Sequence, residues 1–275
     1  VYPPFFSSVR HSGRVVIENP LVPEDPDTGD PGHYRMDLDH LEQCAARPDA
    51  RILLLCSPHN PVGRVWSEEE LTAVLDIARR HRLVVVSDEI HCDLTFTDKP
   101  RHTMLAKLAG PEDALVTAVA PSKSFNMPGL GLSALVIPDA DRRKAMKDVF
   151  ESMHLPQCNP FSIAGFEAGY RHGAPWLDDL MAYLQASRDY VVEAVGQRLP
   201  AIRVSAPEGT YLMWLDCREL GLDDAGLKRF FVREAGVGMN PGLSFGDPGS
   251  GFMRLNIGCA RSVLEEVIGR IEAAL

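Results

Sequence analysis

The sequence Ala120-Pro121-Ser122-Lys123-Ser124-Phe125-Asn126 directly follows an apolar run at residues 114–119 that is typical of a buried strand. Lys123 is therefore expected just beyond the carboxyl end of that strand, and open α/β sheets bind their ligands in the crevice outside those ends. A lysine in such a crevice can act as an amine nucleophile that forms a Schiff base with a carbonyl. Taken alone, Ser122-Lys123 would also fit an exposed loop, so its neighbours decide the interpretation.

Two further apolar runs end in polar residues in the same way. Residues 51–56 lead into Ser57-Pro58-His59-Asn60-Pro61-Val62-Gly63, and residues 83–87 lead into Asp88-Glu89-Ile90-His91. An amine, an amide, a carboxylate and an imidazole would then each follow a hydrophobic strand. Core packing does not require this arrangement, so it indicates a functional site.

The segment between these two runs predicts how the strands are arranged. Ser67 and Glu70 have the spacing of a capping box, and apolar residues recur at helical spacing after them. A strand, a helix and a second strand in this order form a right-handed unit with parallel strands. The sequence thus predicts that Asn60, Asp88 and Lys123 lie along one edge of a parallel sheet.

Together these motifs resemble the signature of the fold-type I pyridoxal-phosphate-dependent aminotransferase superfamily (class I/II). Within this superfamily, the residues of the motifs most resemble those of the MalY/PatB-like cystathionine β-lyase (C–S lyase) branch, and the resemblance extends over the whole chain. The motifs that carry it are His59-Asn60-Pro61-x-Gly63-Arg64-Val65-Trp66, Asp88-Glu89-Ile90-His91, Ser122-Lys123-Ser124-Phe125-Asn126, Gly173-Ala174-Pro175-Trp176-Leu177-Asp178, Thr210-Tyr211-Leu212 with Trp214-Leu215-Asp216, and Arg254-Leu255-Asn256 with Gly258-Cys259.

The resemblance implies an α/β fold in two domains. Residues 1–173 would form the cofactor-binding large domain, a mostly parallel sheet flanked by helices, and residues 174–275 a smaller carboxy-terminal α+β domain that includes a bridging helix. Members of the family begin upstream of Val1, so the resemblance also implies that their usual amino-terminal part, with its phosphate-binding loop, is missing. Residues 1–6 are typical of a chain that leaves a strand.

Residue patterns predict the remaining elements. Strands are expected at 14–19, 133–137, 203–206, 211–215, 237–240 and 252–257, and helices at 37–46, 142–153, 162–170, 176–198, 224–234 and 263–274. Ser262 and Glu265 have capping-box spacing before the last helix. The Pro, Asp and Gly content of residues 20–33 predicts a loop without regular structure.

The resemblance assigns roles around the cofactor, pyridoxal 5'-phosphate. Lys123 would form the Schiff base and later remove the substrate's α-proton, and Asp88 would pair with the pyridine nitrogen. Asn60 and His91 would contact the phenolic oxygen of the ring. Tyr2 would stack on the ring.

Further residues would bind the phosphate and the substrate. Ser122 is implied as a phosphate ligand, whereas Ala120 and Gly131 stand where transaminases have a serine and an arginine. Arg254 would bind the α-carboxylate of an amino acid substrate, a bidentate task that suits the planar guanidinium. The two departures favour the lyase branch over the transaminases.

Three functions remain open from the sequence. The first is a C–S β-lyase that converts cystathionine or a cysteine S-conjugate to a thiol, pyruvate and ammonia. The second is an aminotransferase that uses the same residues. The third is a truncated, cofactor-poor relative that acts as a non-catalytic binding module.

The amino-acid composition argues against some classes of binding partner. The 275 residues are 45% hydrophobic, which is enough for a substantial core, and the net charge of −10 argues against nucleic acid or an anionic membrane as partner. Six scattered cysteines without short spacings predict reduced thiols rather than a metal site, and adjacent His91, Cys92 and Asp93 could not close around one ion unaided. We expect a cytoplasmic homodimer.

Overall fold

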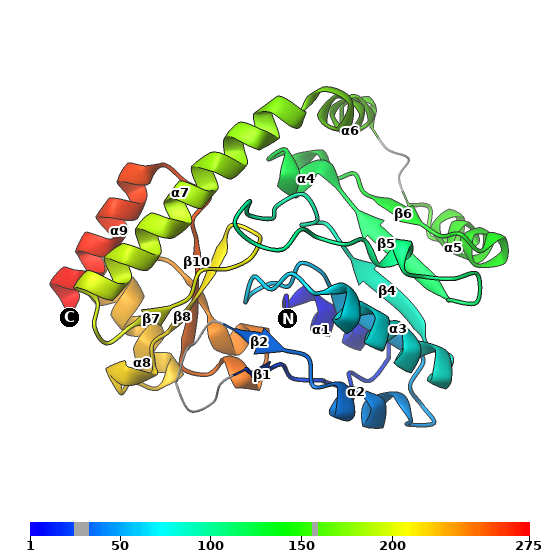
Figure 1. Cartoon of the computed structure of the whole chain (residues 1–275), viewed down its shortest axis with the longest axis horizontal. Helices are drawn as coiled ribbons and strands as arrows, with labels where there is room; N and C mark the ends of the chain where they lie inside the picture. The colour runs from blue at the N-terminus through cyan, green and yellow to red at the C-terminus, as the bar shows by residue number, and fades with distance from the viewer. Residues whose placement is uncertain (25–32, 156–158) are drawn as a thin grey trace.

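A four-stranded sheet carries the polar turns described above. The computed structural model describes residues 1–24, 33–155 and 159–275. The strands lie in the order β3 (Ile52–Cys56), β4 (Val84–Asp88), β5 (Leu115–Val119) and β6 (Ala134–Val136). The first three are parallel, and β6 pairs with β5 in the antiparallel direction. The prediction of a mostly parallel α/β sheet is confirmed (Figure 1).

Helix α3 (Glu68–His81) covers one face of this sheet. Its predicted capping box is present, since Ser67 Oγ accepts from the Glu70 amide and the Glu70 carboxylate accepts from the Ser67 amide. Its apolar stripe, including fully buried Leu71 and Val74, packs against Leu55 of β3 and other core residues. Burying such a side chain contributes about 1.5–3 kcal/mol, so this face anchors the β3–α3–β4 unit.

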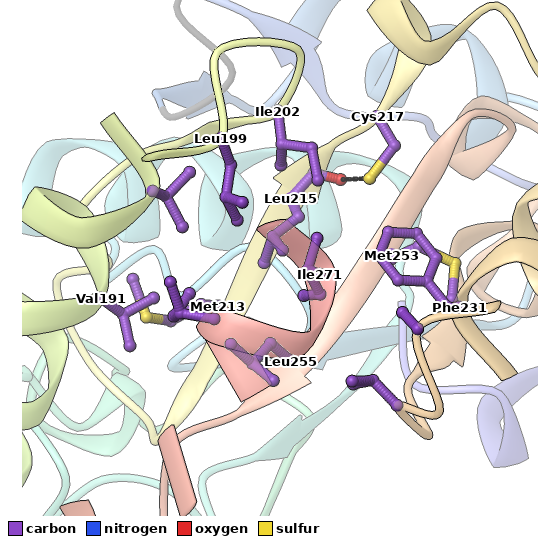
Figure 2. Packing of buried hydrophobic residues seen from close by; sticks show 14 of the residues in the cluster. Val191, Leu199, Ile202, Met213, Leu215, Cys217, Phe231, Met253, Leu255 and Ile271 are labelled. Atoms are coloured by element: carbon purple, nitrogen blue, oxygen red, sulfur yellow. Dashed lines mark hydrogen bonds between the residues drawn. The ribbon is translucent and has the colours of Figure 1, made fainter. Parts of the chain in front are cut away.

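A second, antiparallel sheet lies in the later part of the chain. Its strands are β7 (Arg203–Val204), β8 (Leu212–Asp216), β10 (Phe252–Asn256) and β9 (Asn240–Pro241), in that spatial order. Figure 2 shows its core, where Met213 and Leu215 of β8 meet Met253 and Leu255 of β10. Helices α7 (Ala174–Arg198), α8 (Asp224–Arg229) and α9 (Arg261–Ala274) surround this core, and α8 continues as a π-helix, η4 (Phe230–Glu234).

Helix α7 spans the length between the two sheets. In Figure 1 it starts beside α6 (Pro160–His172), near the larger sheet, and ends beside α9 at the smaller one. The predicted bridging helix is therefore present. Helix α5 (Ala140–Ser152) lies beside β6 and buries none of its side chains.

The remaining helices are short. They are α4 (Pro121–Ser124) and the 3-10 turns η1 (Leu105–Lys107), η2 (Pro128–Leu130), η3 (Arg218–Leu220), η5 (Gly242–Phe245) and η6 (Asp247–Gly249). Helix α2 (Leu38–Ala45) begins after Asp37, whose carboxylate accepts from the His40 amide.

The first part of the chain differs from the prediction. Residues 1–6 were expected to be a chain that leaves a strand, but from Pro4 the chain forms helix α1 (Pro4–His11), because prolines at its start suit the first turn of a helix. The strand predicted at 14–19 is wrong, since these residues join no ladder with described residues. Two short strands, β1 (Val22–Pro23) and β2 (Tyr34–Arg35), pair instead. Of the predicted loop, residues 25–32 lie outside the described residues.

The predicted cap of the last helix is also wrong. The helix begins at Arg261 with Ala260 as its N-cap, and no side chain caps it. Ser262 is therefore already inside the first turn. None of the helices in the described ranges is long and apolar enough to cross a membrane.

Candidate active site

Three strand ends are held side by side by the register of the larger sheet. Cys56 pairs with Asp88, and Asp88 pairs with Ala118, across β3, β4 and β5. Because these strands are parallel, the chain leaves all three at the same edge. Asn60 and Lys123 follow four and five residues after the strand positions that flank Asp88. The structure thus brings the predicted turns together.

The short helix α4 presents Lys123. Ser124, fully buried, donates from Oγ to Oδ2 of Asp93 over 2.7 Å, which ties α4 to the segment after β4. On the other side the Phe125 ring packs on the glycines of the α6–α7 junction. A Cβ on Gly169 would lie 2.8 Å from this ring, and one on Gly173 would lie 2.5 Å from it. Contacts on both sides therefore fix the turn that carries Lys123.

Asp88 ends β4 at this edge. Burial raises the pKa of its carboxyl group, the hydrogen bond from the Ile90 amide lowers it, the neighbouring Glu89 raises it, and the charge of Lys123 lowers it. A cation at this position therefore helps to keep Asp88 ionised.

A buried pair lies next to Asp88. Glu89 is fully buried and accepts from Ser87 Oγ, from the Leu105 amide and from Nε2 of His102, the last over 2.6 Å. No role was predicted for Glu89 or His102. Glu89 is one of several polar residues in Ser87-Asp88-Glu89-Ile90-His91, so local sequence does not distinguish it.

His91 is buried in the same crevice. Burial lowers the pKa of its imidazole to about 3, and the charges of Lys123 and Arg254 add to the effect. The ring is therefore neutral near pH 7. It meets the Tyr211 ring edge-on, with 5.8 Å between ring centroids. Its Nδ1 is buried and has no hydrogen-bond partner among the described residues.

Arg254 reaches this edge from β10 of the smaller sheet. It donates from Nη1 to Oδ1 of Asn60 over 2.9 Å and from Nη2 to Oδ1 of Asn240 over 2.8 Å, and its charge lies over the Phe245 ring. Burial lowers the pKa of the guanidinium. Within the described ranges no carboxylate pairs with it, and its buried Nε has no partner. An anion is the natural complement of this position.

Tyr2 lies at the same place. The ionisable groups of Tyr2 and Tyr211 lie close enough to Arg254 to influence its pKa. The Tyr2 side chain remains partly exposed, at 39%. The predicted residues other than Ser122 therefore lie around one edge, and Tyr211, which shares this edge, was not among the predicted site residues.

The residues predicted around the phosphate lie in the chain on either side of Lys123. Ser122 is half-buried on α4, and its carbonyl accepts from the Met127 amide. Gly131 has a positive φ of 59° and open space where a side chain would project. Ala120 precedes α4 in an extended conformation.

The donor set suits pyridoxal phosphate with an amino acid. The amine of Lys123 and the carboxyl group of Asp88 lie at neighbouring strand ends. Nδ1 of His91 and Nε of Arg254 are buried polar atoms without a hydrogen-bond partner among the described residues, so a bound ligand could supply one. Among the described residues, no group of three His, Cys, Asp or Glu is placed to hold a metal ion.

Comparison with known proteins places the chain in one family. The family model "Aminotransferase class I and II" matches residues 1–271. Cystathionine beta-lyase PatB of Bacillus subtilis is 38% identical over all of this chain and 70% of its own length. Protein MalY of Escherichia coli is 35% identical over 99% of this chain and 68% of its own length. Cystalysin from Treponema denticola, whose crystal structure contains pyridoxal 5'-phosphate, superposes with a TM-score of 0.93 at 33% identity, over 100% of this chain and 68% of that one.

Proposed function

The chain belongs to the class I and II aminotransferase family, and from this premise we propose that it is a pyridoxal-phosphate-dependent C–S β-lyase. Its substrate would be cystathionine or another cysteine S-conjugate, which it would convert to a thiol, pyruvate and ammonia. The 38% identity to PatB supports this choice, because PatB is named a cystathionine beta-lyase. Aminotransferases appear among the relatives at 26% identity.

The main observation in support of this enzymatic function is that the Arg254 guanidinium has hydrogen-bond partners but no ion pair among the described residues. A half-buried guanidinium that has amide partners, and no ion pair within the described ranges, can bind an anion. Arg254 lies near His91, and the charges of both Arg254 and Lys123 lower the pKa of the His91 imidazole. An amino acid whose carboxylate binds Arg254 would therefore have its α-carbon directed toward Lys123.

Bound pyridoxal phosphate supplies an electron sink that stabilises negative charge on the α-carbon. Lys123 would hold the cofactor through Nζ and, once released, take the α-proton on the same nitrogen. Asp88 would hold a proton on the pyridine nitrogen, because an ionised carboxylate stabilises a cation beside it.

Other side chains would orient the ring. Asn60 accepts from Arg254 through Oδ1, so its Nδ2 is the end that can donate to the phenolic oxygen. His91, neutral at pH 7, would contribute a ring N–H to the same oxygen. Tyr2 would stack on the ring, and Ser122 would donate to the phosphate.

Cofactor binding has a direct test. The purified protein with added pyridoxal phosphate is expected to absorb near the edge of the visible range, and borohydride should abolish that band by reducing the bond to Lys123. A protein that stays colourless would support the non-catalytic binding module instead.

The reaction itself is tested with cystathionine and no keto acid. A lyase ends each cycle with the cofactor in its starting form, so many equivalents of pyruvate and thiol per active site are expected. An aminotransferase would stop after a half-reaction until a keto acid is supplied. A burst of at most one equivalent, restored by a keto acid, would replace the lyase with an aminotransferase.

Assembly, location and domain limits remain proposals. A homodimer is supported by apolar side chains exposed along β6, α5 and α6, such as Val136, Met153 and Phe161, the last at 79%. Sedimentation velocity at micromolar concentration should give a dimer, and a monomer would contradict it. The separate cores support domains at 1–173 and 174–275. A cytoplasmic location stays a prediction.

A further inference from the structure

Arg64 is a buried arginine on the turn that follows Asn60. It is 7% exposed, and its guanidinium donates in three directions. Nε donates to the Tyr34 carbonyl over 2.7 Å, Nη1 to Glu208 over 3.0 Å, and Nη2 to both carboxylate oxygens of Glu70 at 2.9 and 3.0 Å. A buried charge is stabilised only when it is paired and hydrogen-bonded, and these partners together fix the position of the Arg64 guanidinium.

Glu208 is the partner from the other part of the chain. It is 8% exposed and lies 144 residues from Arg64, just before β8. The Oε2 atom that accepts from Arg64 also accepts from the Val65 amide over 2.7 Å. The amides of Glu208 and Gly209 both donate to the Gly63 carbonyl, over 2.9 and 3.0 Å. Side chain and backbone thus bind the same turn.

The two segments approach as closely as backbones allow. Gly63 has a positive φ of 71°, and a Cβ there would lie 2.3 Å from Cβ of Pro207. Only glycine fits this contact. The first segment, residues 63–65, is therefore pressed against the second, residues 207–210.

Segment 207–210 is also bound on its other side. The Phe96 amide donates to the Glu208 carbonyl over 3.1 Å, and the Thr210 amide donates to the Leu94 carbonyl over 2.7 Å. In Figure 1 the yellow chain before β8 passes beside the cyan loops that follow β3 and β4. The segment is therefore held between the turn after Asn60 and the loop after His91.

This segment leads directly to the residues of the smaller sheet that reach the site. Tyr211 is the next residue, and it lies edge-on to His91. The strand that follows pairs Trp214 with Arg254 in the β8–β10 ladder. The position of segment 207–210 therefore determines the position of Arg254 relative to Asn60.

We propose that Arg64 and Glu208 are positioning residues, whose buried ion pair holds Arg254 in register with Asn60 before the substrate arrives. Neither residue lies among those that would touch cofactor or substrate, so they act through segment 207–210. The inference rests on the proposed function only in giving Arg254 the substrate carboxylate. Pre-set geometry of this kind matters because a displacement near 1 Å can cost about a hundredfold in rate.

The variants are chosen to separate positioning from ordinary stability. Glu208→Gln keeps the size and an acceptor for the Val65 amide but removes the charge, and Arg64→Met removes the guanidinium. Arg64→Lys keeps the charge without the planar fork. Arg79→Met is the control, because Arg79 donates from Nε and Nη2 to the two carboxylate oxygens of Asp113, whose side chain is 4% exposed. This pair joins α3 to the loop before β5, and no partner of Arg79 lies in residues 63–65 or 207–210.

Three measurements on the cofactor-loaded protein test the proposal: kcat and KM with cystathionine, calorimetric binding of L-alanine, and the midpoint of urea unfolding. Arg64→Met and Glu208→Gln are expected to raise KM and the L-alanine dissociation constant about tenfold, with kcat within about threefold. Arg64→Lys should recover part of the loss. Arg79→Met should lower the urea midpoint and leave both constants near wild type.

Two outcomes would overturn the proposal. One is unchanged L-alanine binding in Glu208→Gln, the variant expected to retain the fold. The other is an equal loss of binding in Arg79→Met, because the effect would then follow stability. If wild type binds L-alanine but releases no pyruvate from cystathionine, the lyase function fails while the binding comparison still decides the role of Arg64 and Glu208.

Discussion

Arg254 donates to Oδ1 of Asn60 over 2.9 Å, and this bond joins a strand of the smaller sheet to the turn after β3. The two residues lie 194 positions apart in the chain. The acceptor is a neutral amide, so the bond orients the guanidinium without neutralising its charge. Arg254 is thereby held in place and still able to bind a carboxylate.

Replacing Arg254 by lysine should weaken substrate binding. The change Arg254→Lys keeps a positive charge but loses the fork that can bind two carboxylate oxygens, at a cost of about 1.5–3 kcal/mol. We expect KM for cystathionine to rise roughly ten- to hundredfold, with a smaller change in kcat, in steady-state assays of pyruvate release. An unchanged KM would remove Arg254 from the substrate site. Arg270→Lys, on the exposed side of α9, is the control.

Replacing Lys123 by alanine should abolish turnover, because no other described lysine stands at the strand ends. Pyruvate release should fall to the assay background, and the borohydride-sensitive absorbance should disappear. The far-ultraviolet circular dichroism should stay that of the wild type. Lys107→Ala, at an exposed lysine on η1, should keep normal activity. Near-normal turnover in Lys123→Ala would contradict the mechanism.

His91 should make the fold sensitive to acid. Its pKa is about 3 in the folded protein and near 6.5 when exposed, so between these values the unfolded chain binds a proton that the folded chain does not. Stability attributable to His91 is intact above pH 6.5 and is lost as the pH falls toward 3, at about 1.4 kcal/mol per pH unit.

The check is urea unfolding at pH 6.0, 5.5 and 5.0. The variant His91→Gln should show a pH dependence shallower by up to about 1.4 kcal/mol per unit. His59, whose pKa burial also lowers, remains in both proteins, so the difference isolates His91. Equal slopes would mean that His91 becomes protonated in the folded state.

Two serines with the same sequence spacing should differ in their effect on stability. Ser67→Ala removes a cap that the structure contains and should cost about 1 kcal/mol in the free energy of unfolding. Ser262→Ala removes no cap and should stay within about 0.5 kcal/mol of wild type. Chemical denaturation of both variants measures this, and equal losses would show that the capping geometry has been misjudged.

These serines also show what local sequence can predict. Helix α3 follows the polar turn after β3, and it begins at the place that the capping-box spacing of Ser67 and Glu70 predicts. Before α9 the helix already starts at Arg261, which leaves Ser262 inside it. Residues 14–19 have the apolar content of a strand, but a strand also needs a partner, which local sequence does not specify.

The candidate site follows the same rule. Asn60, Asp88 and Lys123 were predictable because each lies at the end of its strand or four residues beyond it, and parallel strands place such residues at one edge. Arg64 and Glu208 were not, because they are 144 positions apart and no local spacing connects them. Tyr211 was visible only as part of a motif, and its contact with His91 depends on how the two sheets meet.

The contact between segments 63–65 and 207–210 has a consequence for the order of folding. The buried core beside α3 uses residues between 36 and 115, and that of the smaller sheet uses residues between 191 and 271, so each can form from one continuous stretch. Bonds such as the one from the Val65 amide to Glu208 close a loop of 143 residues, and long loops close slowly. The two cores should therefore form first, and the amides of Gly209 and Thr210 should become protected from hydrogen exchange later than those of β8.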